Sequence, residues 1–374
     1  MPSIFPVRGQ PDEDREYRHP RIKAEKRDPL RVRREVLDVP VFARPRLPIP
    51  RVPPSGNDEW DLLPPLEEIV EGVNMFTRHY FQLGFIHKQA FPAQLRASHR
   101  SVSVFFLLSL LSVSARLTPS LVKRYGSAVA AADNFMEKAS SLALSELYRE
   151  PNLVRCQAFY LLSIAQQGSG EKHRSSINMG IAVRIASLMQ LHREETYTLT
   201  AQTRSIIIEA ESARRTLWML HSQDNLHSGP RSPVSLSASD ITTLLPCNEQ
   251  DFLNAVVPKS RAALEGTPPA ISNPELVRLK DKSLFATLIQ THYYWGMISR
   301  RAISQDKSPR PWESTSEYAH MERRLAEWEA NLPADHRWSK VLFNGHKCEG
   351  QDLVCPPAGP RFAASMAHVL TVDV

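Results

Sequence analysis

Residues 121–148 read LVKRYGSAVAAADNFMEKASSLALSELY, and they carry the clearest periodic pattern in the chain. Apolar residues recur there at steps of four and three, which places them on one face of a helix: Tyr125, Val129, Ala132, Met136, Ala139 and Ala143. Thr118 and Pro119 supply an N-cap and a first helical residue, and Pro151 stops the segment. The pattern therefore predicts one long helix over residues 121–148.

Helical periods recur along most of the chain after Pro65. One amphipathic helix is predicted by Ile177, Ile181, Ile185 and Leu188. A second is predicted by Ile206, Ala210, Ala213, Leu217 and Leu220, and it spaces Glu211 and Arg215 for an i,i+4 ion pair. Further helices are expected over residues 66–83, 102–115, 153–167, 276–303 and 318–331, with a proline-rich loop region over 228–273. Because no run of alternating residues predicts a strand, the expected fold class is all-α.

Length and composition argue against several classes of protein. Of the 374 residues, 42% are hydrophobic and 23% are charged, which is typical of a globular protein with its own core. No segment reaches the ~20 apolar residues that cross a bilayer, and prolines interrupt the N-terminus where a secretory signal would be apolar. The cysteines are too scattered for a disulfide framework: Cys156, Cys247, Cys348 and Cys355. We therefore expect neither membrane association nor secretion.

The net charge of +6 is concentrated in residues 1–57. This segment has 13 Lys or Arg residues against 8 Asp or Glu, whereas residues 58–374 have 33 against 32. It also holds 11 of the 29 prolines, so it is expected to be a disordered basic arm. A loose basic cluster in this arm suits nuclear import or weak phosphate contact, and equally a solvated linker: Lys23, Lys26, Arg27, Arg31, Arg33 and Arg34.

The motifs of common enzymes are missing from the sequence. It has no G-x-x-x-x-G-K-[ST], G-x-G-x-x-G, G-x-S-x-G or H-E-x-x-H motif. Cys348 and Cys355 lack a C-x-x-C partner, and the 13 histidines do not cluster with carboxylates at ligand spacing. We therefore expect no catalytic, cofactor-binding or metal-binding residue. An enzyme assembled from residues distant in sequence is the remaining alternative.

Four short motifs follow one another through residues 66–340. They are FTRHYF at 76–81 with GFIHKQAF at 84–91; GIAVRIA at 180–186 with LHR at 191–193; ESARRTLW at 211–218, then Asp224 and LLP at 244–246; and LAEW at 325–328 with LP at 332–333. Their order and spacing resemble the middle homology region of fungal-specific transcription factors. This region is the helical regulatory domain of binuclear zinc-cluster regulators of the xylanolytic activator-like type.

The sequence departs from this family in several places. The family's DNA-binding module needs six cysteines, beginning with a C-x-x-C pair, ahead of the regulatory domain, whereas the first cysteine here is Cys156. Asn225 follows Asp224 where the family often has Arg, and Gln190 stands where a glycine is usual. The DNA-binding module is therefore expected to be absent, with zinc expected only if a missing cluster lies upstream.

The resemblance implies a nuclear regulator of metabolic or biosynthetic genes. Its helical domain, residues 58–340, would change state with a small-molecule effector or a partner, and residues 341–374 would form a shortened C-terminal extension. The implied partners are DNA, through the family role, and related regulators in homo- or heterodimers. Two alternatives stay open: an interaction module that pairs with a full-length regulator, and a gene model that lacks an upstream zinc cluster.

The resemblance also marks nine residues, most of which are expected to be structural: His87, Gly180, Arg184, His192, Arg214, Arg215, Trp218, Asp224 and Pro246. The two arginines are expected to anchor neighbouring carboxylates, such as Asp224 or Glu211. If Asp224 is such an anchor, its replacement by alanine destabilises the whole domain.

Four of the marked residues have individual expectations. Trp218 is expected in the core, and His87 in a packed or hydrogen-bonded loop. His192 is expected in the last turn of its helix, where a cation suits the helix dipole. Glycine in a helix costs about 1 kcal/mol relative to alanine, so Gly180 is expected to mark a close contact between helices.

Overall fold

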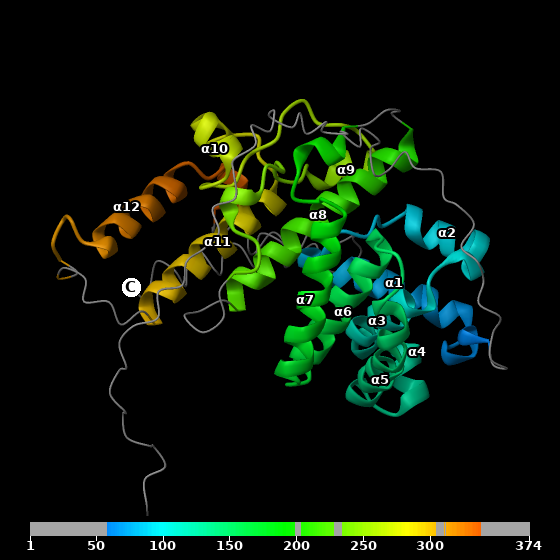
Figure 1. The fold of residues 1–374 in the computed structure, drawn as a ribbon. Helices are drawn as coiled ribbons and strands as arrows, with labels where there is room; N and C mark the ends of the chain where they lie inside the picture. Colours follow the sequence, from blue (N-terminus) through cyan, green and yellow to red (C-terminus); the bar gives the residue numbers. More distant parts are fainter. Residues whose placement is uncertain (1–57, 199–202, 228–233, 304–309, 311, 338–374) are drawn as a thin grey trace, which may run out of the picture. The chain divides into compact units, whose positions relative to one another are not determined.

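The computed structural model describes residues 58–198, 203–227, 234–303, 310 and 312–337, all of which belong to one compact unit (Figure 1). These residues contain α-helices and short 3-10 helices without any β-strand, which confirms the all-α fold class. The α-helices are α1 (Leu66–His79), α2 (Ala90–Ser98), α3 (Val104–Ser114), α4 (Pro119–Tyr125), α5 (Ala128–Leu147), α6 (Leu153–Gly168), α7 (Lys172–Leu188), α8 (Arg204–His227), α9 (Glu249–Asn254), α10 (Pro268–Ser272), α11 (Leu284–Ile303) and α12 (Glu317–Ala330). The 3-10 helices are Glu59–Leu62, Phe81–Leu83, His99–Ser101, Ala115–Leu117, Glu194–Tyr197, Ala238–Asp240, Pro274–Leu276 and Ala334–His336.

Helix α3 is the most deeply buried element. Every one of its residues is buried, and α1, α5 and α6 pack against it. Ser103 begins the helix, because its side chain accepts a hydrogen bond from the backbone N of Phe106. A helix that is apolar on all sides is stable only when other elements surround it, and each fully buried Leu or Phe contributes about 1.5–3 kcal/mol. The apolar run at residues 102–115 is therefore the centre of the core.

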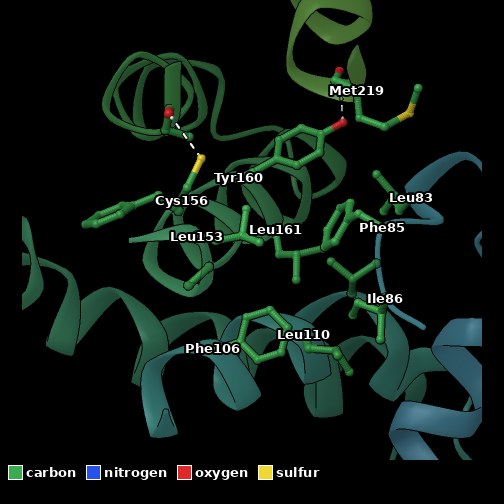
Figure 2. Close-up of a cluster of buried hydrophobic side chains, with 14 of the residues drawn as sticks. Leu83, Phe85, Ile86, Phe106, Leu110, Leu153, Cys156, Tyr160, Leu161 and Met219 are labelled. Carbon is green, nitrogen blue, oxygen red and sulfur yellow. Dashed lines mark hydrogen bonds between the residues drawn. The ribbon is translucent and has the colours of Figure 1, made fainter. Parts of the chain in front are cut away.

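The core continues from α3 into the loop after α1 and into α6. Figure 2 shows Phe85 and Ile86 of that loop gathered with Phe106 of α3 and Tyr160 of α6. Tyr160 also donates from its hydroxyl to the carbonyl of Met219 in α8 at 3.3 Å. The same cluster therefore connects the first helices to α8, which carries several of the residues marked by sequence.

Among the described residues, no single helix has both the length and the apolar composition to cross a membrane. One pair, Val104–Leu117 with Pro119–Tyr125, reaches those values only when taken together, and it is bent by 92°.

The predicted long helix over residues 121–148 is wrong in one respect, because the structure divides it. Gly126 has a φ of +85°, which a helix does not allow, and Ser127 then caps α5 by accepting from the backbone N of Ala130. Pro119 is the first residue of α4 as predicted, but the Thr118 hydroxyl donates to the carbonyl of Ser114 instead of capping the helix.

The predicted buried faces of these helices need two further corrections. Val129 is 69% exposed, although Ala132, Met136 and Ala139 of α5 are buried as predicted. In α7 half of the predicted stripe is wrong: Ile185 is buried and Ile181 is partly buried against the core, but Ile177 is exposed by 65% and Leu188 by 62%. The buried face of α7 consists of small and β-branched residues: Ser175, Ala182, Val183, Ile185 and Ala186. Such residues allow α6 and α7 to pack closely along their length.

The apolar stripe predicted for α8 is confirmed, with Ala210, Ala213, Leu217 and Leu220 buried. The expected helices at 66–83, 153–167, 276–303 and 318–331 correspond to α1 with the following turn, α6, α11 and α12, although α11 begins only at Leu284. The expected arm (1–57), its basic cluster and the extension (341–374) lie outside the described residues.

Candidate functional site

The middle of α8 brings most of the marked residues together. From Ala210 to Ser222 nearly every side chain is buried, including two successive arginines, Arg214 and Arg215. Buried charges are stable only with charged or hydrogen-bonding partners, so these two side chains show which segments must meet at this helix. We call these two arginines, a third arginine and the three glutamates that pair with them the arginine network: Arg214, Arg215, Arg261, Glu194, Glu211 and Glu249.

Arg215 is fully buried and joins three segments. Its Nε donates to Oε1 of Glu211, one turn earlier in α8, at 3.3 Å. One terminal nitrogen donates to the carbonyl of Gly84, at 2.9 Å, and to Oε1 of Glu249, while the other donates to the carbonyl of Cys247 at 3.0 Å. The guanidinium thus fixes the loop after α1 and the segment before α9 on the surface of α8.

Two aromatic rings enclose the Arg215 guanidinium. Its central carbon lies 4.2 Å from the ring centroid of Phe252 and 4.9 Å from that of Phe285. Cation–π contacts of this kind strengthen when water is excluded. Gly84 is required beside them, because a Cβ there would lie 2.8 Å from the carbonyl oxygen of Phe81.

Glu211 is the central carboxylate of the network. Oε1 accepts from Arg215 and from the backbone N of Cys247, at 2.9 Å, and Oε2 lies 2.8 Å from a terminal nitrogen of Arg261. Burial alone raises the pKa of this carboxyl, but Arg261, Arg215 and Arg214 outweigh burial and lower the pKa to about 2. Glu211 is therefore an ionised structural group and not a proton donor near neutral pH.

Arg214 holds a second region against α8. It forms a bidentate pair with Glu194 at 2.7 and 2.8 Å, and it also donates to the carbonyl of Leu244 at 2.8 Å. Its guanidinium lies 4.1 Å from the ring centroid of Tyr197. Trp218, fully buried as predicted, donates from Nε1 to the same Leu244 carbonyl at 2.9 Å. Arg214 and Trp218 thus hold the LLP motif, residues 244–246, against α8.

The structure confirms the expected loop role of His87. Its Nδ1 accepts from the backbone N of Gln89 at 3.2 Å and of Ala90 at 3.0 Å, so the imidazole caps the start of α2. Its Nε2 lies 3.2 Å from the carbonyl of Leu253. Burial lowers the pKa of His87, which matches an imidazole that accepts at one nitrogen. Pro246 is buried too, and its carbonyl accepts from the hydroxyl of Ser283 at 2.8 Å.

Three of the marked residues behave differently from expectation. Asp224 does not bind the arginines, which pair with Glu194, Glu211 and Glu249; it accepts from the backbone N of Ser235 at 2.5 Å. Glu194, before α8, and Glu249, at the start of α9, reach the two arginines directly. Asp224 lies more than two turns beyond them along α8.

His192 and Gly180 are the other two corrections. His192 follows the end of α7 at Leu188, and burial lowers its pKa, so it is not a cation at a helix end. A Cβ at Gly180 would meet no atom within 4 Å, so this glycine marks no helix contact. Arg184, on the same helix, is exposed.

The two described cysteines do not fit a zinc cluster. Burial raises the pKa of Cys156 and of Cys247 to about 12, so both are thiols, and Cys156 donates to the carbonyl of Ala182. Among the described residues, no group of three or more His, Cys, Asp or Glu is placed to hold a metal ion.

Sequence reasoning missed four members of the site: Glu194, Tyr197, Glu249 and Arg261. They lie in loops or short helices with no periodic pattern, and they reach α8 from three segments: the 3-10 helix Glu194–Tyr197, the start of α9 and the loop that contains Arg261. The only available signal was the need of Arg214 and Arg215 for carboxylates, which does not identify the partners.

The comparisons with known proteins concern the same region. The family profile of the fungal specific transcription factor domain matches residues 74–330. An uncharacterized transcriptional regulatory protein of Schizosaccharomyces pombe is 26% identical over 321 residues, which cover 81% of this chain and 32% of the relative. A Zn(2)-C6 fungal-type transcription factor of Fusarium oxysporum f. sp. lycopersici is 25% identical over 291 residues, which cover 74% of this chain and 30% of the relative.

The chain thus spans about a third of the length of these curated relatives. No solved structure matches it.

Proposed function

The chain belongs to the family of the fungal specific transcription factor domain, and from that premise we propose that it acts as the regulatory part of a fungal transcription regulator. The observation that carries the proposal is the overlap between the matched residues, 74–330, and the helices that the arginine network holds together. The names of the relatives, a transcriptional regulatory protein and a Zn(2)-C6 transcription factor, support the same role.

We further propose that the protein is not an enzyme and uses no cofactor of its own. The charged groups of the arginine network are directed at one another and at backbone carbonyls. Side chains occupied in this way stabilise a fold but are not free to transfer protons or attack a substrate. We therefore infer that the family's sequence motifs have a structural role, and that regulation acts through the binding of an effector or a partner.

The proposal includes a nuclear location, target genes in metabolism or biosynthesis, and partners of two kinds. DNA would be reached through the family role, and related regulators through pairing. An effector or partner would act by binding one state of the helical domain more tightly than another.

Tethering tests the proposed function directly. The chain is fused to a heterologous DNA-binding domain and expressed in yeast with a reporter gene of intermediate basal transcription, so that activation and repression are both measurable. We expect the fusion to change reporter output relative to the DNA-binding domain alone. A fusion carrying Arg215→Met, which breaks the network, should lose the effect, whereas one carrying Arg96→Met at the exposed surface of α2 should keep it. Unchanged reporter output with the wild-type fusion present in the nucleus contradicts the proposal.

A further inference from the structure

Helix α7 has an outer face that the described part of the chain leaves exposed. Its inner face packs on α6 and, to a smaller extent, on α8. On the outer side, Ile177 is 65% exposed and Leu188 is 62% exposed. Single exposed apolar residues are common on globular proteins, but these two share one side of the same helix, about three turns apart. Their placement is typical of a helix with packing partners on both sides.

The apolar stripe continues between these two residues. Steps of four, three and four residues place Ile181 and Arg184 on the same side of α7 as the two ends, with Gly180 at the edge. Ile181 is partly buried, whereas Gly180 and Arg184 are exposed. We call these residues the outer stripe: Ile177, Gly180, Ile181, Arg184 and Leu188. With a rise of 1.5 Å per residue the outer stripe is about 17 Å long, which a single partner helix can cover.

Gly180 and Arg184 are also the two exposed residues among the nine that were marked by sequence. Glycine within a helix is destabilising relative to alanine, yet a Cβ at Gly180 would meet no atom within 4 Å. Packing within the described chain therefore does not require a glycine at this position. A second helix that crosses α7 here would benefit from it, because glycine allows two helix backbones to approach closely.

The charge of α7 indicates which kind of partner fits. Its basic residues are Lys172, His173, Arg174 and Arg184, and its sequence contains no Asp or Glu. Arg174 pairs with Glu171 at 3.1 Å, whereas Arg184, within the outer stripe, has no carboxylate partner among the described residues. A second copy of α7 would bring like charges together, and an acidic helix would neutralise them.

Arg184 also sets a condition on the sequence of the partner. It lies between Ile181 and Leu188 along the outer stripe, so a partner that covers these apolar residues also removes water from the guanidinium. A charge that loses its water without gaining a counterion is strongly destabilising. The partner therefore needs a carboxylate opposite Arg184 in addition to apolar residues opposite the rest of the stripe.

We propose that the outer stripe binds an amphipathic α-helix of a partner protein, whose apolar face is flanked by glutamate or aspartate. A helix fits because the backbone groups of α7 are bonded within the helix, so that recognition depends on side chains at helical spacing. The proposal goes beyond the regulatory role, since it concerns a surface of this chain and does not depend on transcription.

Fluorescence anisotropy with the full chain and a labelled synthetic peptide tests the proposal. The probe is a peptide of three heptads with Leu at every a and d position and Glu at every e and g position. Its glutamates repel one another between copies, which keeps the probe monomeric. One comparison peptide has Lys in place of Glu, and another has Ser in place of Leu. We expect saturable binding of the probe, and affinities roughly tenfold or more weaker for both comparison peptides.

Substitutions in the chain assign the binding to the outer stripe. Ile177→Ser removes an apolar contact and Arg184→Glu reverses the central charge, so each should weaken probe binding roughly tenfold to a hundredfold. Both positions are exposed, so both variants should fold as the wild type does, which circular dichroism checks. Ile271→Ser on α10 and Arg96→Glu on α2 make the same changes at other exposed positions and should bind as the wild type does.

Gly180 provides an independent readout of the helix crossing. A leucine at this position extends into open space, so Gly180→Leu should fold. Its side chain would hold the two helix backbones apart, and we therefore expect weaker probe binding than in the wild type. Probe binding that is unchanged in this variant would contradict a close approach at Gly180.

Three further results overturn the proposal. The first is equal binding of the probe and of either comparison peptide. The second is equal probe affinity in the wild type, Ile177→Ser and Arg184→Glu. The third is a dimer of the chain in analytical ultracentrifugation that Ile177→Ser dissociates, because the occupant would then be a second copy. None of these results decides the tethering experiment, so failure of the outer stripe and failure of the regulatory role are distinguishable.

Discussion

Glu211 and Arg215 lie one turn apart on α8 with their side chains 3% and 0% exposed, and Nε of Arg215 donates to Oε1 of Glu211 at 3.3 Å. An i,i+4 ion pair on a helix surface contributes only about 0.2–0.5 kcal/mol. Burial makes this pair more important for stability, because removing one partner leaves the other charge buried and uncompensated. The pair is therefore a structural part of the buried core and not a surface ion pair.

Arg215→Met should lower the free energy of unfolding by about 3–5 kcal/mol, because Glu211 and Glu249 lose their shared partner while Glu211 stays buried. Urea denaturation followed by circular dichroism measures this change. Arg184→Met is the matched control at an exposed position and should stay within about 0.5 kcal/mol of the wild type. Equal losses in the two variants would show that the network is not a centre of stability.

Asp224→Ala should have a smaller effect than the sequence alone suggested. Asp224 binds Ser235 and neither of the paired arginines, so we expect a loss of about 1–2 kcal/mol. The same denaturation experiment provides the measurement. Ser235→Ala, which removes only the hydroxyl bond, is the control and should cost less. A loss as large as that of Arg215→Met would restore the original hypothesis that Asp224 anchors the whole domain.

Glu211→Gln should change how stability depends on pH. The folded pKa of about 2 is below the ordinary 4.5, so the ionised carboxylate stabilises the fold above pH 4.5, and this contribution is lost as pH falls towards 2. The stability gap between wild type and variant should therefore narrow between pH 5 and about 2. Denaturation at a series of pH values checks this.

Glu329→Gln, at an exposed position of α12, serves as the control and should follow the wild type at every pH. Parallel pH curves for the wild type and Glu211→Gln would contradict the assigned ionisation of Glu211.

Gly180→Ala and Gly72→Ala should have opposite effects on thermal stability. Gly180 lies in α7 with nothing within 4 Å of an added Cβ, so alanine should stabilise the protein by about 0.5–1 kcal/mol. Gly72 lies in α1, where the Cβ would come within 2.4 Å of a methyl group of Leu111, so alanine there should destabilise by about 1–3 kcal/mol. Differential scanning calorimetry measures both. A destabilising Gly180→Ala would indicate a contact that the isolated chain does not show.

The sequence predicted the helices well where one segment carried its own information. Apolar periodicity identified α5, α6, α8 and α11, and the apolar run at 102–115 became the buried α3. It failed at the break between α4 and α5, where Gly126 has a positive φ and Ser127 is extended. It failed in part on α7, where the small residues of the buried face lie between apolar residues that face outward. Periodicity measures which residues are apolar, not how closely two helices approach.

The site was predictable only in part. The paired arginines, Trp218 and His87 were identified from motifs, and Glu211 from its i,i+4 spacing. The partners Glu194, Glu249 and Arg261 were not, because each is defined by a contact between distant segments.

By itself, the sequence determined an all-helical chain with two paired arginines in an amphipathic helix, because helix formation and amphipathicity depend on neighbours within a few turns. Only the tertiary structure decided which carboxylates neutralise those charges and which glycines have room for a side chain. Those outcomes depend on the distances between segments far apart in the chain, and no local pattern of residues encodes them.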